Sequence, residues 1–201
     1  MITVAGVILA GGQSSRYGKP KMFEQFNGQF LYQYSLQALK KNALKPLIIS
    51  TNASLSSQFV EKDVLLNIEE MPHQGPLFAI HNLLSKTTDA DWFFALASDM
   101  PFITDSFVKK MLSLVDNTYD AIVPKQSDKI QPLAALYHRR ALHKTEKLLQ
   151  QQKRSMKSLL DQLNVYYVPV SDDEQALINI NAIADWPELP NILHKKGDYH
   201  V

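Results

Sequence analysis

The stretch Val4-Ala5-Gly6-Val7-Ile8-Leu9-Ala10-Gly11-Gly12 decides the predicted fold. It joins a short apolar run, from Val4 to Leu9, to two consecutive glycines. An apolar run without alternating polar residues is typical of a strand that is buried on both faces, as in a parallel sheet. Glycines directly after such a strand let backbone N–H groups turn toward a ligand with no side chain in the way. The stretch therefore predicts a buried strand that ends in a ligand-binding loop.

Strands and helices are predicted to alternate along the rest of the chain. Apolar runs predict strands at 46–50, 64–68, 92–97, 119–124, 132–137 and 165–170, and apolar periodicity predicts helices at 30–40, 76–84, 104–114, 141–152 and 158–163. Such alternation favours a three-layer α/β fold, a mostly parallel sheet with helices on both faces. We predict one domain over residues 1–190 and a polar tail over residues 191–201. Ligands of such sheets bind beyond the carboxyl ends of the strands.

Composition narrows the class of function. The chain has 201 residues, and 21 basic against 20 acidic side chains leave a net charge of +1. This balance argues against a nucleic-acid partner held by bulk electrostatics. The lack of cysteine excludes disulfides, thiolate metal sites and cysteine nucleophiles. No apolar run approaches the roughly 20 residues that span a bilayer, and the N-terminus lacks the basic start of a secretory signal. We therefore expect a cytoplasmic protein without a membrane partner.

A positively charged loop follows the first strand. The segment Leu9–Lys21 reads Leu-Ala-Gly-Gly-Gln-Ser-Ser-Arg-Tyr-Gly-Lys-Pro-Lys. Phosphate oxygens suit the N–H groups of a glycine turn, and three cations can reach the same anion: Arg16, Lys19 and Lys21. The Walker pattern is excluded because five residues instead of four separate Gly12 from Gly18, and the G-x-G-x-x-G pattern is absent. The alternative is a loop whose glycines serve only the turn geometry.

A carboxylate follows the strand predicted at 92–97. The chain continues Ser98-Asp99-Met100-Pro101, which places Asp99 at the same edge of the sheet as the glycine loop. Mg²⁺ prefers oxygen ligands and usually takes one or two protein carboxylates together with phosphate. Asp99 is thus sufficient to anchor a Mg²⁺–triphosphate. The alternative is an aspartate that caps a turn before Pro101.

These motifs together resemble one enzyme family. Leu-Ala-Gly-Gly, then Ser-x-Arg-x-Gly and lysine, is similar to the signature of nucleotidyltransferases that join a nucleoside triphosphate to a phosphorylated acceptor. From Ile2 to about Leu189 the chain resembles the molybdenum cofactor guanylyltransferases. The resemblance implies a Rossmann-like nucleotidyltransferase fold. It also implies that GTP and molybdenum-bearing molybdopterin are converted to the guanine dinucleotide cofactor and pyrophosphate, and that molybdoenzyme-maturation proteins are partners. The catalytic group would be Arg16, Lys21 and Asp99, with Mg²⁺ on Asp99.

The resemblance also implies a nucleotide site. Its members would be Leu9, Ala10, Gly11, Gly12, Lys21, Asn67, Gly75, Pro76, Leu77 and Asp99. The segment Gly75–Ile80 resembles the family's G-P-L-x-G-I, with Ala79 in place of glycine. Asn67 stands where the family usually has an aspartate that can accept two guanine N–H bonds, whereas an amide accepts at one end only. If Asn67 reads the base, Asn67→Asp should sharpen the preference for GTP. Glu69 and Glu70 are the alternative carboxylates for this role, although neither is in register with that aspartate.

The motifs say less about which residues bind the acceptor substrate. Ile178-Asn179-Ile180-Asn181 resembles the family's N-x-N-T-P segment, which makes Asn179 and Asn181 candidates for contacts to the acceptor; the alternative is a strand end with turn-forming asparagines. The basic residues of the later half form either a solvated helix face or a docking surface for the phosphate of a pterin. Two rival functions remain: a sister enzyme that uses CTP or a sugar phosphate, and a nucleotide-binding regulator without turnover.

Overall fold

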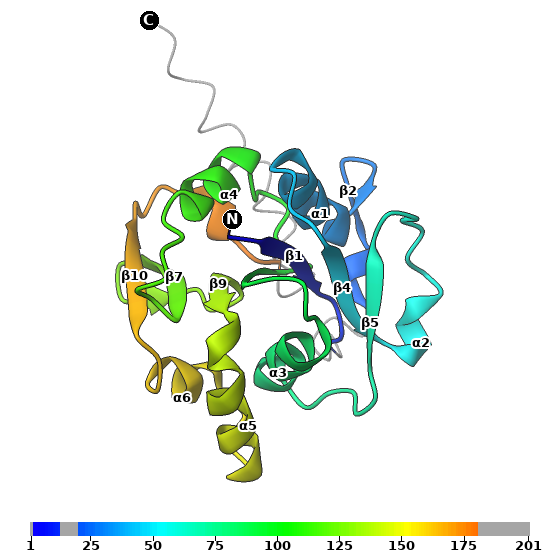
Figure 1. Cartoon of the computed structure of the whole chain (residues 1–201). Coiled ribbons are helices and arrows are strands. Elements are labelled where there is room, and N and C mark those ends of the chain that lie inside the picture. Colours follow the sequence, from blue (N-terminus) through cyan, green and yellow to red (C-terminus); the bar gives the residue numbers. More distant parts are fainter. Residues whose placement is uncertain (1, 13–19, 181–201) are drawn as a thin grey trace, which may run out of the picture.

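The computed structural model of the protein describes residues 2–12 and 20–180. Its main sheet has eight strands, and Figure 1 shows the sheet between helices. Along the sheet the order is β10-β7-β9-β6-β1-β4-β5, with β8 beside β7. The strands of this sheet are β1 (Val4–Leu9), β4 (Leu47–Asn52), β5 (Leu65–Glu69), β6 (Trp92–Ala97), β7 (Ala121–Gln126), β8 (Lys129–Ile130), β9 (Ala134–His138) and β10 (Val165–Val170). A separate hairpin is formed by β2 (Gln25–Phe26) and β3 (Gln29–Phe30).

Helices cover both faces of this sheet, which confirms the predicted three-layer α/β fold. The helices are α1 (Leu31–Lys41), α2 (Ala53–Ser56), α3 (Pro76–Lys86), α4 (Asp105–Leu112), α5 (Leu142–Gln150) and α6 (Met156–Leu160). Buried side chains of α1 and α4 pack with one face of the strands, and those of α3, α5 and α6 with the other. The two groups lie on opposite sides of the sheet in Figure 1. Apolar burial on both faces is what the unbroken apolar runs predicted.

Two strands of the main sheet run against the parallel majority: β9 and the short β8, which is antiparallel to β7. The strands β1, β4, β5 and β6 are mutually parallel, and β10 is parallel to β7. By contrast, β9 is antiparallel to both β6 and β7. Only residues 127–133 separate β7 from β9. A parallel connection needs a crossover of about a dozen residues or more, so this short link, which includes β8, forces the chain to reverse.

Local signals explain where several helices begin. Pro76 stands in the first turn of α3, where its missing N–H costs nothing. The Thr104 hydroxyl accepts a hydrogen bond from the Phe107 N–H and caps α4. The predicted helix 158–163 instead begins at Met156, because Ser155 caps it by accepting from the Ser158 N–H. The predicted helix 141–152 is α5, preceded by one 3₁₀ turn at Arg139–Ala141.

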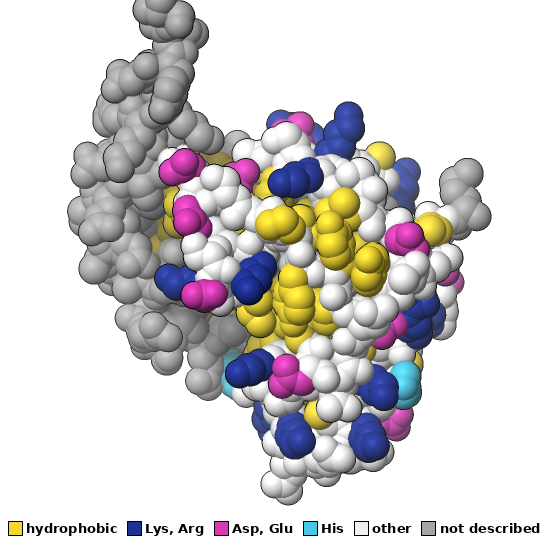
Figure 2. All heavy atoms as spheres, turned by 90° about the vertical axis from the view of Figure 1, so that its left-hand side faces the viewer, with side chains coloured by type: hydrophobic (Ala, Val, Ile, Leu, Met, Phe, Trp, Pro, Cys, Tyr) yellow, Lys and Arg dark blue, Asp and Glu magenta, His cyan; other side chains and the backbone are white. Residues whose placement is uncertain are grey.

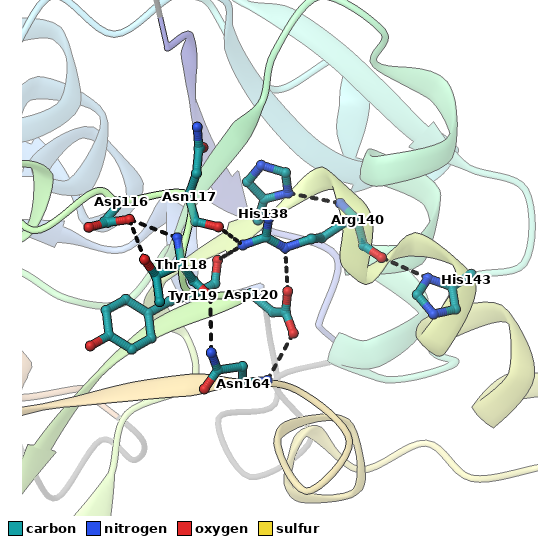
Figure 3. A network of polar contacts seen from close by, with 9 residues as sticks. All are labelled: Asp116, Asn117, Thr118, Tyr119, Asp120, His138, Arg140, His143 and Asn164. Carbon is teal, nitrogen blue, oxygen red and sulfur yellow. Dashed lines mark hydrogen bonds and ion pairs between the residues drawn. The ribbon is translucent and has the colours of Figure 1, made fainter.

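Arg140 ties together the amino ends of β7 and β10 with the end of β9 (Figure 3). Its guanidinium contacts the Asp120 carboxylate and donates to the carbonyls of Asn117, at 2.6 Å, and Tyr119. The other Asp120 oxygen accepts from the Asn164 N–H at 2.9 Å. Burial tends to raise the pKa of Asp120, but the hydrogen bonds from Asn164 and Arg140 outweigh burial and lower it.

The outer edge of the sheet at β10 carries aromatic residues, of which Tyr167 is exposed and Tyr166 is half-buried. Tyr166 stacks on Tyr119 with ring centroids 5.1 Å apart, and Tyr167 is 40% exposed. Figure 2 looks onto this side of the molecule and shows hydrophobic side chains gathered among lysines and arginines. Within the described ranges, no helix is both long and apolar enough to cross a membrane.

Candidate active site

A pocket of about 300 Å³ lies at the carboxyl ends of β1 and β5, beside the start of α3. Its lining combines the end of β1, the two glycines of the loop, the end of β5 and the first turn of α3. The residues are Leu9, Gly11, Gly12, Glu69, His73, Gly75, Pro76, Ala79 and Leu133. The amino end of a helix favours an anion, because its first N–H groups point outward along a positive dipole. The pocket is therefore suited to a ligand with apolar surface and negative charge.

The backbone of β4 fixes the path of the chain as it leaves β1. The Ala10 N–H donates to the Ser50 carbonyl at 2.8 Å, and the Thr51 hydroxyl donates to the Ala10 carbonyl at 3.1 Å. Gly11 then passes so close to Glu69 that an added Cβ would lie 3.1 Å from Oε1. Among the residues that the structure describes, a Cβ on Gly12 would meet no atom within 4 Å. Gly11 is thus needed for packing inside the protein, whereas Gly12 borders open space in the pocket.

Glu69 places a buried carboxylate in this pocket. The residue is 7% exposed, and Oε1 accepts a hydrogen bond from the Ser50 hydroxyl at 3.2 Å. Burial raises the pKa of Glu69, while the Ser50 hydroxyl and the nearby His73 act in the opposite direction. The sequence analysis named this residue only as an alternative, because it is out of register with the family's aspartate. The available signal was the period of two along a strand, which puts Glu69 on the same face of β5 as Asn67.

A second polar group surrounds Asp99 just beyond β6. Asp99 is 5% exposed, and its carboxylate contacts the Lys21 ammonium. Lys21 also donates to the Ile180 carbonyl at 3.0 Å, and the Asn179 amide donates to Asp99 Oδ1 at 3.4 Å. The Ile180 N–H donates to the Asp99 carbonyl at 3.0 Å. Three segments that are distant in sequence therefore converge on one carboxylate.

The Asn179 side-chain oxygen is buried, and no described residue donates a hydrogen bond to it. A buried polar atom without a partner is costly, so such an atom in a native site calls for a ligand or an ion. Among the described residues there is no cluster of three or more His, Cys, Asp or Glu that could hold a metal by itself. An ion here would therefore need oxygen atoms from Asp99, Asn179 and a bound ligand.

The structure separates the predicted site residues into three sets. Leu9, Gly11, Gly12, Gly75 and Pro76 line the pocket. Lys21, Asp99 and Asn179 form the second polar group. Of the remaining described candidates, Ala10 and Leu77 are buried in the core, and Asn67 is absent from the pocket lining. Arg16 and Asn181 lie outside the described residues.

Comparison with known proteins places this chain in a family. Residues 6–166 match the MobA-like NTP transferase domain. The chain belongs to this family of nucleotidyltransferases. A relative from Geobacillus sp. (strain WCH70), named "Probable molybdenum cofactor guanylyltransferase", is 35% identical over 94% of this chain and 99% of its own length.

Solved structures share the fold of this MobA-like chain. The molybdopterin-guanine dinucleotide biosynthesis protein A of Archaeoglobus fulgidus aligns with a TM-score of 0.76 and 24% identity, over 95% of this chain and 99% of that one. The 4-diphosphocytidyl-2C-methyl-D-erythritol synthase of Anaerococcus prevotii aligns with a TM-score of 0.75 and 11% identity, over 96% of each chain. These two likenesses concern the fold alone, which accommodates more than one nucleotide and acceptor.

Proposed function

We propose that this MobA-like enzyme transfers GMP from GTP to the terminal phosphate of molybdenum-bearing molybdopterin, giving the guanine dinucleotide cofactor and pyrophosphate. The observation that carries this proposal is the pocket at the end of β1, with Glu69 at one side and the Lys21–Asp99–Asn179 group just beyond the end of the neighbouring strand β6. The name of the Geobacillus relative, which is similar along nearly its whole length, supports the same reaction.

Glu69 is the group that we propose to read the base. A guanine edge presents an N–H and an amino group side by side, and an ionised carboxylate accepts from both. The corresponding edges of cytosine and adenine mix a donor with an acceptor, which would face a carboxylate oxygen. The buried position of Glu69 makes that mismatch costly, since an unpaired polar group out of water loses its hydration. The pocket is thereby selective for GTP.

Asp99 and Asn179 are the residues that we propose to hold Mg²⁺. Both present oxygen atoms, the Asn179 oxygen lacks a donor within the described part of the chain, and the Lys21 ammonium already shows that a cation fits against Asp99. When bound, Mg²⁺ would neutralise negative charge on the phosphates. The carbonyl of Ile180 holds Lys21 at this place and keeps a positive charge near the phosphate path.

The chemistry requires no protein nucleophile. A terminal phosphate oxygen of molybdopterin attacks the α-phosphorus of GTP, and the bond from that phosphorus to the pyrophosphate oxygen breaks. The protein's part is to align the two substrates and to offset phosphate charge with Lys21 and Arg16. Asn179 and Asn181 would meet the acceptor side. We place the reaction in the cytoplasm, in a single nucleotidyltransferase domain over residues 1–190, with molybdoenzyme-maturation proteins as partners of the product.

The test is a panel of the four nucleoside triphosphates with molybdopterin as acceptor, read by pyrophosphate release. We expect kcat/KM to be highest for GTP, and release to require both the acceptor and a divalent ion. A preference for CTP would overturn the guanylyl assignment in favour of a sister enzyme. Binding of GTP without pyrophosphate release would instead indicate a regulator.

A further inference from the structure

Three side chains form a hydrogen-bonded chain behind the base pocket. The Asn67 amide nitrogen donates to the Ser50 hydroxyl at 3.2 Å, and that hydroxyl donates to Glu69 Oε1 at 3.2 Å. Ser50 on β4 and Asn67 on β5 are directly paired in the register of the sheet. Ser50 is fully buried and Glu69 nearly so. This series of hydrogen bonds therefore runs from Asn67 on the edge strand β5, through Ser50 on β4, to Glu69 at the pocket.

The direction of these bonds is set by the chemistry of a serine hydroxyl. It carries one hydrogen and two lone pairs, whereas an amide nitrogen can only donate. Because Asn67 donates to the Ser50 oxygen, the single Ser50 hydrogen is free to point at Glu69. No described residue donates to the second oxygen of Glu69, Oε2, through a hydrogen bond. The carboxylate is thus anchored at one oxygen while it borders the pocket.

We propose that Asn67 and Ser50 are positioning residues, which hold the Glu69 carboxylate as a two-oxygen acceptor for guanine. This inference rests on the proposed function, in which Glu69 meets the base. It gives Asn67 a different role from direct base reading: Asn67 acts through Ser50 and is not among the residues that line the pocket. The two roles make opposite predictions for one substitution.

Asn67→Asp reverses which of these side chains donate and which accept the hydrogen bonds. An aspartate at position 67 is an acceptor, so it takes the Ser50 hydrogen and turns a Ser50 lone pair toward Glu69. It also adds a second negative charge close to the first, which disfavours ionisation of Glu69. Direct base reading by residue 67 predicts that Asn67→Asp sharpens the choice of GTP. Positioning predicts that it weakens the choice, with Asn67→Ala, which removes the donor but adds no acceptor, lying in between.

The experiment compares kcat/KM for GTP and for ITP, whose base lacks the 2-amino group. We expect the unmodified enzyme to prefer GTP by on the order of tenfold or more, since a buried acceptor would lose one donor with ITP. The ratio should fall several-fold in Asn67→Ala and toward unity in Asn67→Asp. Asn117→Asp is the matched control, because it adds the same charge on the exposed turn before β7, at the end of the sheet opposite to the pocket. It should leave the ratio unchanged.

The pH profile gives a readout that a merely structural role would not move. The base is read by ionised Glu69, so kcat/KM for GTP should fall on the acid side of the profile. Asn67→Asp should move that acid limb to higher pH, because a second carboxylate raises the pKa of Glu69. His73 is the titratable side chain that acts on Glu69 in the described part of the protein, and this residue is present in each variant. Glu69→Gln should abolish both this limb and the GTP preference.

The outcomes separate the two proposals. If the unmodified enzyme prefers CTP, or if Glu69→Gln keeps the GTP/ITP ratio, then Glu69 does not read the base and the proposed site fails. If Glu69→Gln removes the ratio but Asn67→Asp raises it or leaves both it and the acid limb in place, the positioning role is overturned. Ser50→Ala keeps the inference testable should Asn67→Asp fold poorly: it removes the donor to Glu69 with a smaller side chain, and an unchanged ratio there would also overturn the inference.

Discussion

The polar groups at the two ends of the sheet differ in how completely they are hydrogen-bonded within the protein. At the amino edge, the Arg140 guanidinium, the Asp120 carboxylate and the Asn164 amide bond to one another and to nearby carbonyls (Figure 3). At the carboxyl edge, the Asn179 oxygen is buried without a donor from the described residues, and the Glu69 carboxylate borders a pocket. A satisfied network stabilises a fold, whereas buried groups left short of partners are available to a ligand. This is the difference that we expect between polar groups that stabilise the fold and polar groups that bind a ligand.

The largest expected effect comes from Asp99→Asn. If Asp99 anchors the catalytic ion, turnover should fall by roughly 10²–10³-fold, about 3–4 kcal/mol. Asp120→Asn is its counterpart at the other edge and should leave kcat nearly unchanged. The measurement is steady-state pyrophosphate release at limiting Mg²⁺, on variants shown to be folded by circular dichroism. Equal losses of turnover in both variants would contradict the proposed difference between the two ends of the sheet.

Lys21→Ala should have the next largest effect. Lys21 contacts Asp99 and Ile180, and removal of a charge-assisted contact to phosphate should cost about 1.5–3 kcal/mol, or about 10–150-fold in kcat/KM. Lys41→Ala removes the same charge at the exposed end of α1 and is the matched control. Small and equal effects of both substitutions would mean that the phosphates bind elsewhere.

Asp120→Asn tests whether the network at the amino ends of the strands stabilises the fold. The variant should lower the free energy of unfolding by about 1–3 kcal/mol at pH 7, because Arg140 and the Asn164 N–H lose a charged acceptor. The pKa of Asp120 is lowered in the fold, so its contribution is present above the unfolded value of about 4 and is lost as pH falls through the folded value. Urea unfolding should show a smaller difference in the free energy of unfolding between the two proteins at pH 3 than at pH 7. A difference in the free energy of unfolding that is larger at pH 3 would contradict a lowered pKa of Asp120 in the fold.

The smallest expected effect is that of Gly12→Ala. Its added Cβ meets no atom of the described residues, so the unfolding temperature should stay the same. If the nucleotide approaches the backbone at Gly12, KM for GTP should rise several-fold to about tenfold, up to about 1.4 kcal/mol. Gly11→Ala should behave differently and lower stability as well, because its Cβ would press on Glu69. A Gly12→Ala enzyme with normal KM would place the ligand away from the loop.

Local pattern was enough to predict much of this protein. The apolar run at Val4–Leu9 and the later apolar runs predicted the layered sheet, because burial on both faces leaves no alternation in the sequence. The glycines after β1 and the aspartate after β6 were found for a similar reason: parallel strands bring their carboxyl ends to one edge. The family signature added the reaction. Each of these inferences depends only on neighbours along the chain.

Tertiary structure decided which polar groups meet. Asn179 and Asp99 lie 80 residues apart in sequence, and only the folded chain brings the amide to the carboxylate. Likewise, the register between β4 and β5 pairs Ser50 with Asn67 and thereby directs a hydroxyl at Glu69. The reversal of β9 came from the short link after β7, which apolar patterning cannot reveal. Register and side-chain approach are set by packing among distant segments, so a pattern read along one strand cannot contain them.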